Sequence, residues 1–218
     1  MGDGEYVYCI ISRKNAPDNF GITGIKGEPV YCIHYNDLSA VVSKAPMIEY
    51  KATEENTTIH RDVNQHILKN HTVLPVALGM VFKNRGVLIN TMRRVYGVLR
   101  RSLRLVDNKI ELGVKAILPK DKEVFEGCVE KSVGEFRKLC EEEYLKELRE
   151  LSVETKEGKL FSERLAFNYS FLVEREKIPL FTEKITTLEE KHNQLLTKYT
   201  GPWPPYNFVD IKIMGKGG

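Results

Sequence analysis

The stretch LAFNYSFLVE, residues 165–174, decides the fold of the C-terminal half of the chain. Its large apolar side chains stand at every second position: Leu165, Phe167, Tyr169, Phe171 and Val173. A period of two matches the alternation of side chains across a β-strand, whereas a helix would scatter these residues around its surface. The stretch therefore predicts a strand with one face in a core.

The segments on either side of this strand predict a ferredoxin-like arrangement. A strand is expected over 110–118, a weak one over 151–156 and an extended segment over 195–199. A short helix fits 179–193, because proline is well placed in a first helical turn. A long amphipathic helix after Pro119 is marked by Val124, Cys128, Val133, Phe136, Cys140 and Leu148. The order is then β-α-β-β-α-β, the split β-α-β topology.

The N-terminal half predicts three strands before its first helix. The runs 5–12, 30–35 and 38–43 are rich in β-branched and aromatic residues. The last two are joined through Asn36 and Asp37, which tolerate tight turns, so we expect a hairpin. The glycine- and proline-containing stretch 15–29 reads as a long loop.

Two helices and one more strand complete this half. Thr53 is a suitable N-cap for a helix with apolar positions Ile59, Val63 and Ile67. The apolar run VLPVALGMVF, residues 73–82, predicts a buried strand in which proline and glycine favour an edge position, a bulge or a bend. A second helix is indicated by Met92, Val95, Leu99, Leu103 and Val106.

These elements define an α+β protein with two domains. Residues 1–108 form an N-terminal mixed β-β-β-α-β-α domain, and 109–218 form a C-terminal ferredoxin-like domain with a terminal segment rich in proline and tryptophan. The length of 218 residues suits this division.

The overall composition excludes several classes of protein. The chain has 33 basic and 30 acidic side chains, a formal net charge of +3, so a polyanionic partner is not demanded. No apolar run approaches the ~20 residues of a membrane span, and no secretory signal begins the chain, which predicts a cytoplasmic protein. The four cysteines form no C-x-x-C pair and are expected to be reduced.

No catalytic, cofactor or metal site can be assembled from the sequence. The glycines around Lys26 lack the Ser or Thr of a phosphate-binding loop. His60, His66 and His71 are not spaced to share one helical face as metal ligands. The arginines of 93–104 could track a phosphate backbone, but a solvated flank beside the apolar stripe is the more common outcome. We therefore expect a non-enzymatic protein without cofactors.

The segment YTGPWPPYNFV, residues 199–209, places the only tryptophan among three prolines. Proline removes backbone donors and fixes φ, so this segment is expected to be stiff and extended. It could seal a domain or the junction between domains, because aromatic residues are common in cores. Alternatively, it could be a recognition surface, because rigid aromatic groups are good interface anchors.

This segment resembles the C-terminal motif G-P-W-P-P-Y-x-F of the gas vesicle GvpF/GvpL family. The match runs from Gly201 to Phe208. Three further stretches agree with the family: the opening YVYCII, the hairpin HYNDLSAVVSKAP at 34–46, and the segment 168–175 that ends in FLVER. The resemblance covers nearly the whole chain.

The resemblance implies a two-domain fold with a ferredoxin-like C-terminal part, no cofactor and a role in gas vesicle formation. It implies the hydrophobic shell protein GvpA and other gas vesicle accessory proteins as partners, with neither nucleic acid nor membrane lipid, at the gas vesicle and in the cytoplasm. An accessory protein that covers the apolar face of the shell subunit would prevent its aggregation. The candidate contact residues are Val76, Leu78, Met80, Phe82, Trp203, Tyr206 and Phe208.

Two other functions stay open. Ferredoxin-like domains often bind small molecules, so a ligand-sensing regulatory module is the first alternative. An RNA-binding protein that uses the arginine-rich helix is the second, and it predicts a steep dependence of affinity on salt concentration.

Overall fold

The computed structural model describes residues 3–118, 133–162, 164–192 and 195–209. It has two compact units, one formed by Met1–Asn108 with Pro204–Gly218 and the other by Lys109–Trp203. The expected second domain ran from 109 to 218. In the structure, residues 204–209 group with the first unit instead, because Phe208 is buried there and Tyr206 is hydrogen-bonded to Asn64.

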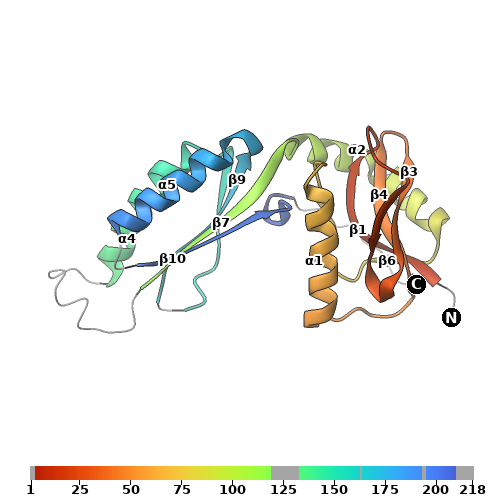
Figure 1. Ribbon diagram of the computed structural model, residues 1–218, viewed down its shortest axis with the longest axis horizontal. Helices are drawn as coiled ribbons and strands as arrows, with labels where there is room; N and C mark the ends of the chain where they lie inside the picture. Colours follow the sequence, from red (N-terminus) through yellow and green to blue (C-terminus); the bar gives the residue numbers. More distant parts are fainter. Residues whose placement is uncertain (1–2, 119–132, 163, 193–194, 210–218) are drawn as a thin grey trace. The chain divides into compact units, whose positions relative to one another are not determined.

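The first unit is built on an antiparallel sheet (Figure 1). Its strands are β1 (Asp3–Ser12), β2 (Asn19–Thr23), β3 (Pro29–Tyr35), β4 (Leu38–Pro46), β5 (Leu74–Pro75) and β6 (Val81–Phe82). The order is β2-β3-β4-β1-β5, and β6 also pairs with β1. The predicted hairpin is β3 and β4, in which Tyr35 lies opposite Leu38.

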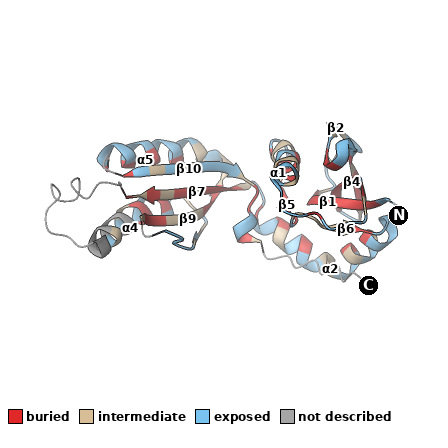
Figure 2. Cartoon of the chain, turned by 90° about the horizontal axis from the view of Figure 1, so that it is seen from below, coloured by how far each residue is buried: buried red, intermediate tan, exposed pale blue. Residues whose placement is uncertain are grey.

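Helices cover both faces of this sheet, with α1 (Glu54–Leu68) on one side and α2 (Arg85–Leu105) on the other (Figure 2). Strand β1 is consequently buried from Gly4 to Ile11. Both predicted helices are confirmed. The Thr53 side chain accepts a hydrogen bond from the Asn56 N–H and caps α1, and Asn84 caps α2 in the same way through Val87.

Two predictions for the first unit are corrected. The expected loop 15–29 contains strand β2 and a short 3-10 helix, Ile25–Gly27. The run 73–82 is not one continuous strand, because only β5 and β6 at its ends pair with β1. The bend predicted from its proline and glycine lies between these two strands.

The second unit confirms the ferredoxin-like prediction. Its elements follow the order β-α-β-β-α-β: β7 (Lys109–Ile117), α4 (Val133–Arg149), β8 (Glu154–Glu157), β9 (Leu165–Glu174), α5 (Ile178–Lys191) and β10 (Leu196–Trp203). The antiparallel sheet has the order β10-β7-β9-β8. Of the positions that predicted the first helix, Val124 and Cys128 lie outside the described residues.

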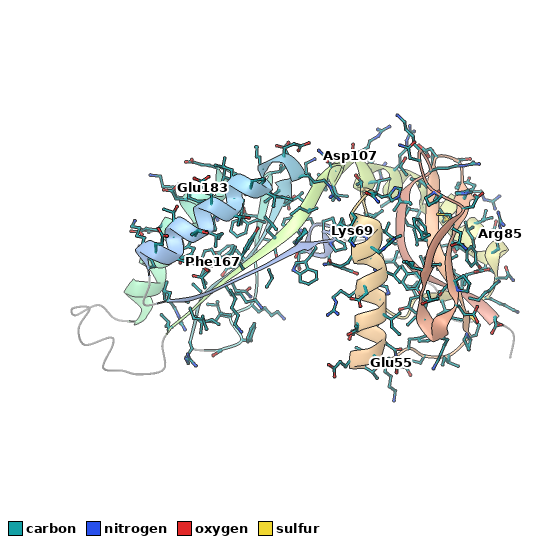
Figure 3. The ribbon with its side chains drawn as sticks, in the orientation of Figure 1. Glu55, Lys69, Arg85, Asp107, Phe167 and Glu183 are labelled. Atoms are coloured by element: carbon teal, nitrogen blue, oxygen red, sulfur yellow. The ribbon has the colours of Figure 1, made fainter. Side chains whose placement is uncertain are left out.

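The alternating side chains of 165–174 form the core of this unit. The ring of Phe167 packs against Tyr144 of α4, and that of Phe171 against Phe181 of α5. Because both phenylalanines point to one face of β9, the two helices cover the same face of the sheet, and Phe167 lies between sheet and helices (Figure 3). Lys184 of α5 forms an ion pair with Glu147 of α4 at 2.8 Å.

Cys9 and Cys32 are buried free thiols. They lie on β1 and β3, which are separated by β4, and both are opposite Val41. Strands two positions apart in a sheet are about 9.5 Å from each other. A disulfide needs Cα atoms within about 7 Å, so these two thiols do not form a bridge, in agreement with the expected reduced state.

Candidate protein-binding site

The first candidate segment forms a short loop between β5 and β6. The Val76 N–H donates to the carbonyl of Tyr8 at 3.1 Å, and the Met80 carbonyl accepts from the Val7 N–H at 2.9 Å. Between these two bonds, Ala77, Leu78 and Gly79 leave the strand direction. Gly79 has a φ of 83°, a conformation that favours glycine.

Buried polar groups hold both ends of this loop. The Gly79 N–H donates to the Tyr6 hydroxyl at 3.1 Å, and that hydroxyl is 3.0 Å from Nδ1 of His60. Nε2 of His60 is 3.1 Å from the carbonyl of Val76. A carbonyl can only accept, so Nε2 carries the proton and Nδ1 accepts from Tyr6. The helical histidine thus positions the loop.

Burial fixes the protonation of this network. It lowers the pKa of His60 to about 4 and raises the pKa of Tyr6 to about 12. At neutral pH, His60 is therefore a neutral imidazole and Tyr6 keeps its hydroxyl proton. Each group then has the donor or acceptor that its neighbours require.

The predicted contact residues of this segment divide by exposure. Val76 and Phe82 are 5% and 4% exposed, so both are core residues of the first unit. Leu78 and Met80 are half-buried and reach the surface. Val76 and Phe82 lie at the two ends of the run, where the chain is paired with β1, whereas Leu78 lies in the loop between them.

Two exposed residues that the sequence analysis did not select lie beside this loop. Met47 and Ile48, after β4, are 41% and 49% exposed. Sδ of Met47 and Cγ1 of Val81 both lie against Gly4. A Cβ added to this glycine would be 2.6 Å from the first atom and 2.9 Å from the second, so Met47 adjoins β6. An apolar pair between Pro46 and Glu49, outside any periodic pattern, was the available signal.

Tyr50, which follows this pair in the chain, lies against the loop between β5 and β6. Its carbonyl oxygen would be 3.1 Å from a Cβ added to Gly79. The segment 47–50 therefore lies beside β6 and Gly79. We call the exposed and half-buried apolar residues of these two segments, which are Met47, Ile48, Leu78, Met80 and Val81, the apolar patch.

The second candidate segment, with the family motif, is divided between the units. Trp203 ends β10 in the second unit and is half-buried. Phe208 is 4% exposed in the first unit, which supports the interpretation that the segment seals a domain. Tyr206 is 42% exposed, and its hydroxyl accepts a hydrogen bond from Nδ2 of Asn64 at 3.3 Å.

Helix α1 connects both candidate segments. His60 binds the first segment at Val76, and Asn64, one turn later, binds the second at Tyr206. The Asn64 amide also donates to the carbonyl of His60 at 3.0 Å. Tyr206 and the loop between β5 and β6 are thus attached to the same face of one helix, although the sequence placed them in different domains.

The described residues provide no alternative site with evident chemistry. No group of three metal-ligating side chains occurs within 3–118, 133–162, 164–192 and 195–209. In the same ranges, no helix is long and apolar enough to cross a membrane. The first unit has an open cavity of about 390 Å³, in whose lining Arg100 and Asp37 form an ion pair at 3.2 Å.

Comparisons with known proteins agree with the motif and the fold. The chain is 38% identical to gas vesicle protein F of Haloferax mediterranei over 98% of its own length and 96% of that protein. It is 36% identical to gas vesicle protein F1 of Halobacterium salinarum, with the same coverage.

Solved structures of gas vesicle protein GvpF share the fold. That of Anabaena has a TM-score of 0.85 at 19% identity and covers 96% of this chain and 99% of its own. That of Microcystis aeruginosa has a TM-score of 0.82 at 17% identity and covers 95% and 99%. The family model of the gas vesicle synthesis protein GvpL/GvpF matches residues 4–139 and 126–210, and the chain belongs to this family.

Proposed function

We propose that this protein is a non-enzymatic gas vesicle assembly protein that binds the hydrophobic shell subunit GvpA through the apolar patch. Its membership of the gas vesicle synthesis protein GvpL/GvpF family and its relatives named gas vesicle protein F support a role in gas vesicle assembly. The observation that supports the contact surface is the exposure of Met47 and Ile48 beside a loop held from below by buried hydrogen bonds.

The physical need for such a protein follows from the shell. A subunit that turns an apolar face toward gas exposes that face to water before assembly, and exposed apolar faces aggregate. Transient coverage of this face by a partner would keep the subunit soluble until it joins the growing vesicle. The protein would then act in the cytoplasm and at the gas vesicle, and it would need no cofactor.

The composition of the patch suits a transient contact. Met47 and Met80 are unbranched and polarisable, so they adapt to differently shaped apolar surfaces. The edge of β1 beside the patch is already occupied by β5 and β6, which disfavours addition of a strand from the partner there. The contact is therefore expected to use side chains.

Co-expression with the shell subunit tests the proposal. An affinity-tagged wild-type chain should capture the subunit, whereas an Ile48→Ser, Met80→Ser double variant should capture much less and leave more subunit aggregated. Leu180→Ser is the matched control, because Leu180 is 50% exposed and lies in the second unit.

Thermal melting should first establish that all three proteins are folded. Equal capture by the double variant and the wild type would remove the apolar patch as the contact surface. Absence of capture by the wild type would remove the shell subunit as the partner.

A further inference from the structure

Helix α2 has two stripes of side chains, and only one of them belongs to the core. The inner stripe packs on the sheet through Leu88, Met92, Leu99 and Leu103, all of which are buried. The outer stripe recurs at alternating spacings of four and three residues: Val87, Thr91, Arg94, Val98, Arg101 and Leu105. This is the spacing with which one helix presents a continuous seam to another.

The aliphatic members of the outer stripe are unusually accessible. Val87 and Val98 are each 42% exposed, and Leu105 is 47% exposed. Single exposed aliphatic residues are common on protein surfaces. Here, however, they are placed regularly along the length of one helix, whose start and end are near Arg85 and Asp107 in Figure 3.

The charge of α2 is one-sided. Its 85–105 segment contains arginines at 85, 93, 94, 100, 101 and 104 and no Asp or Glu. Among the described residues, Arg100 has an ion pair with Asp37, but no carboxylate lies within 4.0 Å of Arg93, Arg94, Arg101 or Arg104. By contrast, α4 and α5 neutralise one another through Lys184–Glu147 and Lys191–Glu143 pairs.

A glycine flanks the outer stripe, about 100° around the helix from Val98. Gly97 is an exposed residue inside α2, and its φ is not positive, so the backbone does not require glycine there. A Cβ would meet only Nη1 of Arg101, at 3.6 Å. Glycine in a helix costs about 1 kcal/mol relative to alanine. Its lack of a side chain leaves the Arg101 guanidinium, which lies over this position, free to extend toward a partner.

From these features, we propose that the outer stripe of α2 binds an amphipathic helix of a partner protein, with aliphatic residues opposite Val98 and Leu105 and carboxylates opposite Arg94 and Arg101. The complementary charges select an acidic partner. The regular aliphatic positions favour a protein helix over nucleic acid, because a phosphate backbone gains little from contact with valine and leucine. This surface is separate in sequence from the apolar patch.

A synthetic helical peptide can serve as the probe, with leucines at four-three spacing and glutamates beside them. The full-length wild-type protein should bind it, and an Arg94→Glu, Arg101→Glu double variant should bind it roughly tenfold or more weakly. An Arg61→Glu, Lys69→Glu double variant, in α1 and at its C-cap, is the control, because both residues are exposed and the change in net charge is identical.

Gly97 provides a second test that leaves the charge unchanged. Gly97→Ala should be folded and retain binding, whereas Gly97→Leu should be folded and lose it, because only the larger side chain would displace the Arg101 guanidinium. The proposal would be overturned if the two double variants bound the peptide with equal affinity. It would also be overturned if the wild-type protein bound a peptide with lysines in place of the glutamates as well as it binds the original peptide. A third contradicting result would favour nucleic acid: the wild-type protein binds single-stranded RNA more tightly than the acidic peptide, and the Arg94→Glu, Arg101→Glu variant loses this RNA binding. None of these results depends on capture of the shell subunit.

Discussion

The side-chain amide of Asn64 donates a hydrogen bond to the hydroxyl of Tyr206, 3.3 Å away and 142 residues later in the chain. Asn64 is completely buried, and the same amide group also donates to the carbonyl of His60. The family motif is therefore attached to the helix whose histidine holds the loop between β5 and β6. The segment 199–209, which the sequence makes a candidate for recognition, therefore has a structural role through Tyr206 and Phe208.

The first prediction concerns these two aromatic residues. Phe208→Ala should lower the free energy of unfolding by about 3–5 kcal/mol, because it empties a site where the ring is 4% exposed. Tyr206→Phe should cost only about 1 kcal/mol, since it removes the hydrogen bond to Asn64 and keeps the ring. Urea denaturation of the full chain measures both. A loss for Phe208→Ala as small as that for Tyr206→Phe would contradict the burial of this segment.

Local patterns were sufficient to predict the second unit. The alternation from Leu165 to Val173 had only one periodic interpretation, and Pro179 marked the start of the next helix. Strand β2 was not predictable in the same way. Its five residues are exposed or half-buried, and Gly21 within it has a φ of 67°, so neither an apolar pattern nor strand propensity distinguished it from a loop.

The proposed contact surface was only partly predictable, because buried and surface-exposed apolar residues share one composition. Val76 and Met80 belong to the same apolar run, yet the first is buried and the second reaches the surface. Which side chains turn inward is set by hydrogen bonds from β1 and His60, and these come from distant parts of the chain. Met47 and Ile48 gain significance only because the fold places them beside this loop.

The second prediction is a dependence of stability on pH through His60. Its pKa is about 4 in the folded protein and near 6.5 when unfolded, so between these values the unfolded chain binds the additional proton. The free energy of unfolding should therefore fall as pH decreases from about 6.5, by on the order of 3 kcal/mol at pH 4. Urea denaturation at intervals across this range measures the decrease.

His60→Gln is the control for this pH dependence. The variant should be less stable at pH 7, because two buried hydrogen bonds are disturbed, but its stability should vary less with pH. The other histidines and the carboxyl groups titrate in both proteins, so the difference between the two curves isolates His60. Parallel curves between pH 6.5 and pH 5 would show that His60 is not the group responsible.

The third prediction concerns the buried thiols. Burial raises the pKa of the Cys32 thiol to about 12 and that of Cys9 well above its usual range, so neither forms much thiolate at neutral pH. Iodoacetamide should leave both unmodified in the folded protein and modify both in urea. Mass spectrometry of the two separate peptides is the measurement. Modification of either peptide in the folded protein at the rate of a free cysteine would contradict their burial.

The fourth prediction concerns Gly79, whose replacement should affect both the stability of the first unit and the proposed contact with the shell subunit. Gly79→Ala should destabilise the first unit by about 1–2 kcal/mol, because alanine is strained at a φ of 83° and its Cβ would lie 3.1 Å from the carbonyl of Tyr50. Gly97→Ala in α2 is the matched control, and it should be neutral or stabilising, since Gly97 is helical and exposed. Thermal melting compares the two variants directly.

Because the Gly79 N–H also donates to the Tyr6 hydroxyl, replacement of Gly79 should disturb Leu78 and Met80 and weaken capture of the shell subunit, whereas Gly97→Ala should leave capture unchanged. A Gly79→Ala protein with wild-type stability would show that the loop does not need a left-handed residue at this position.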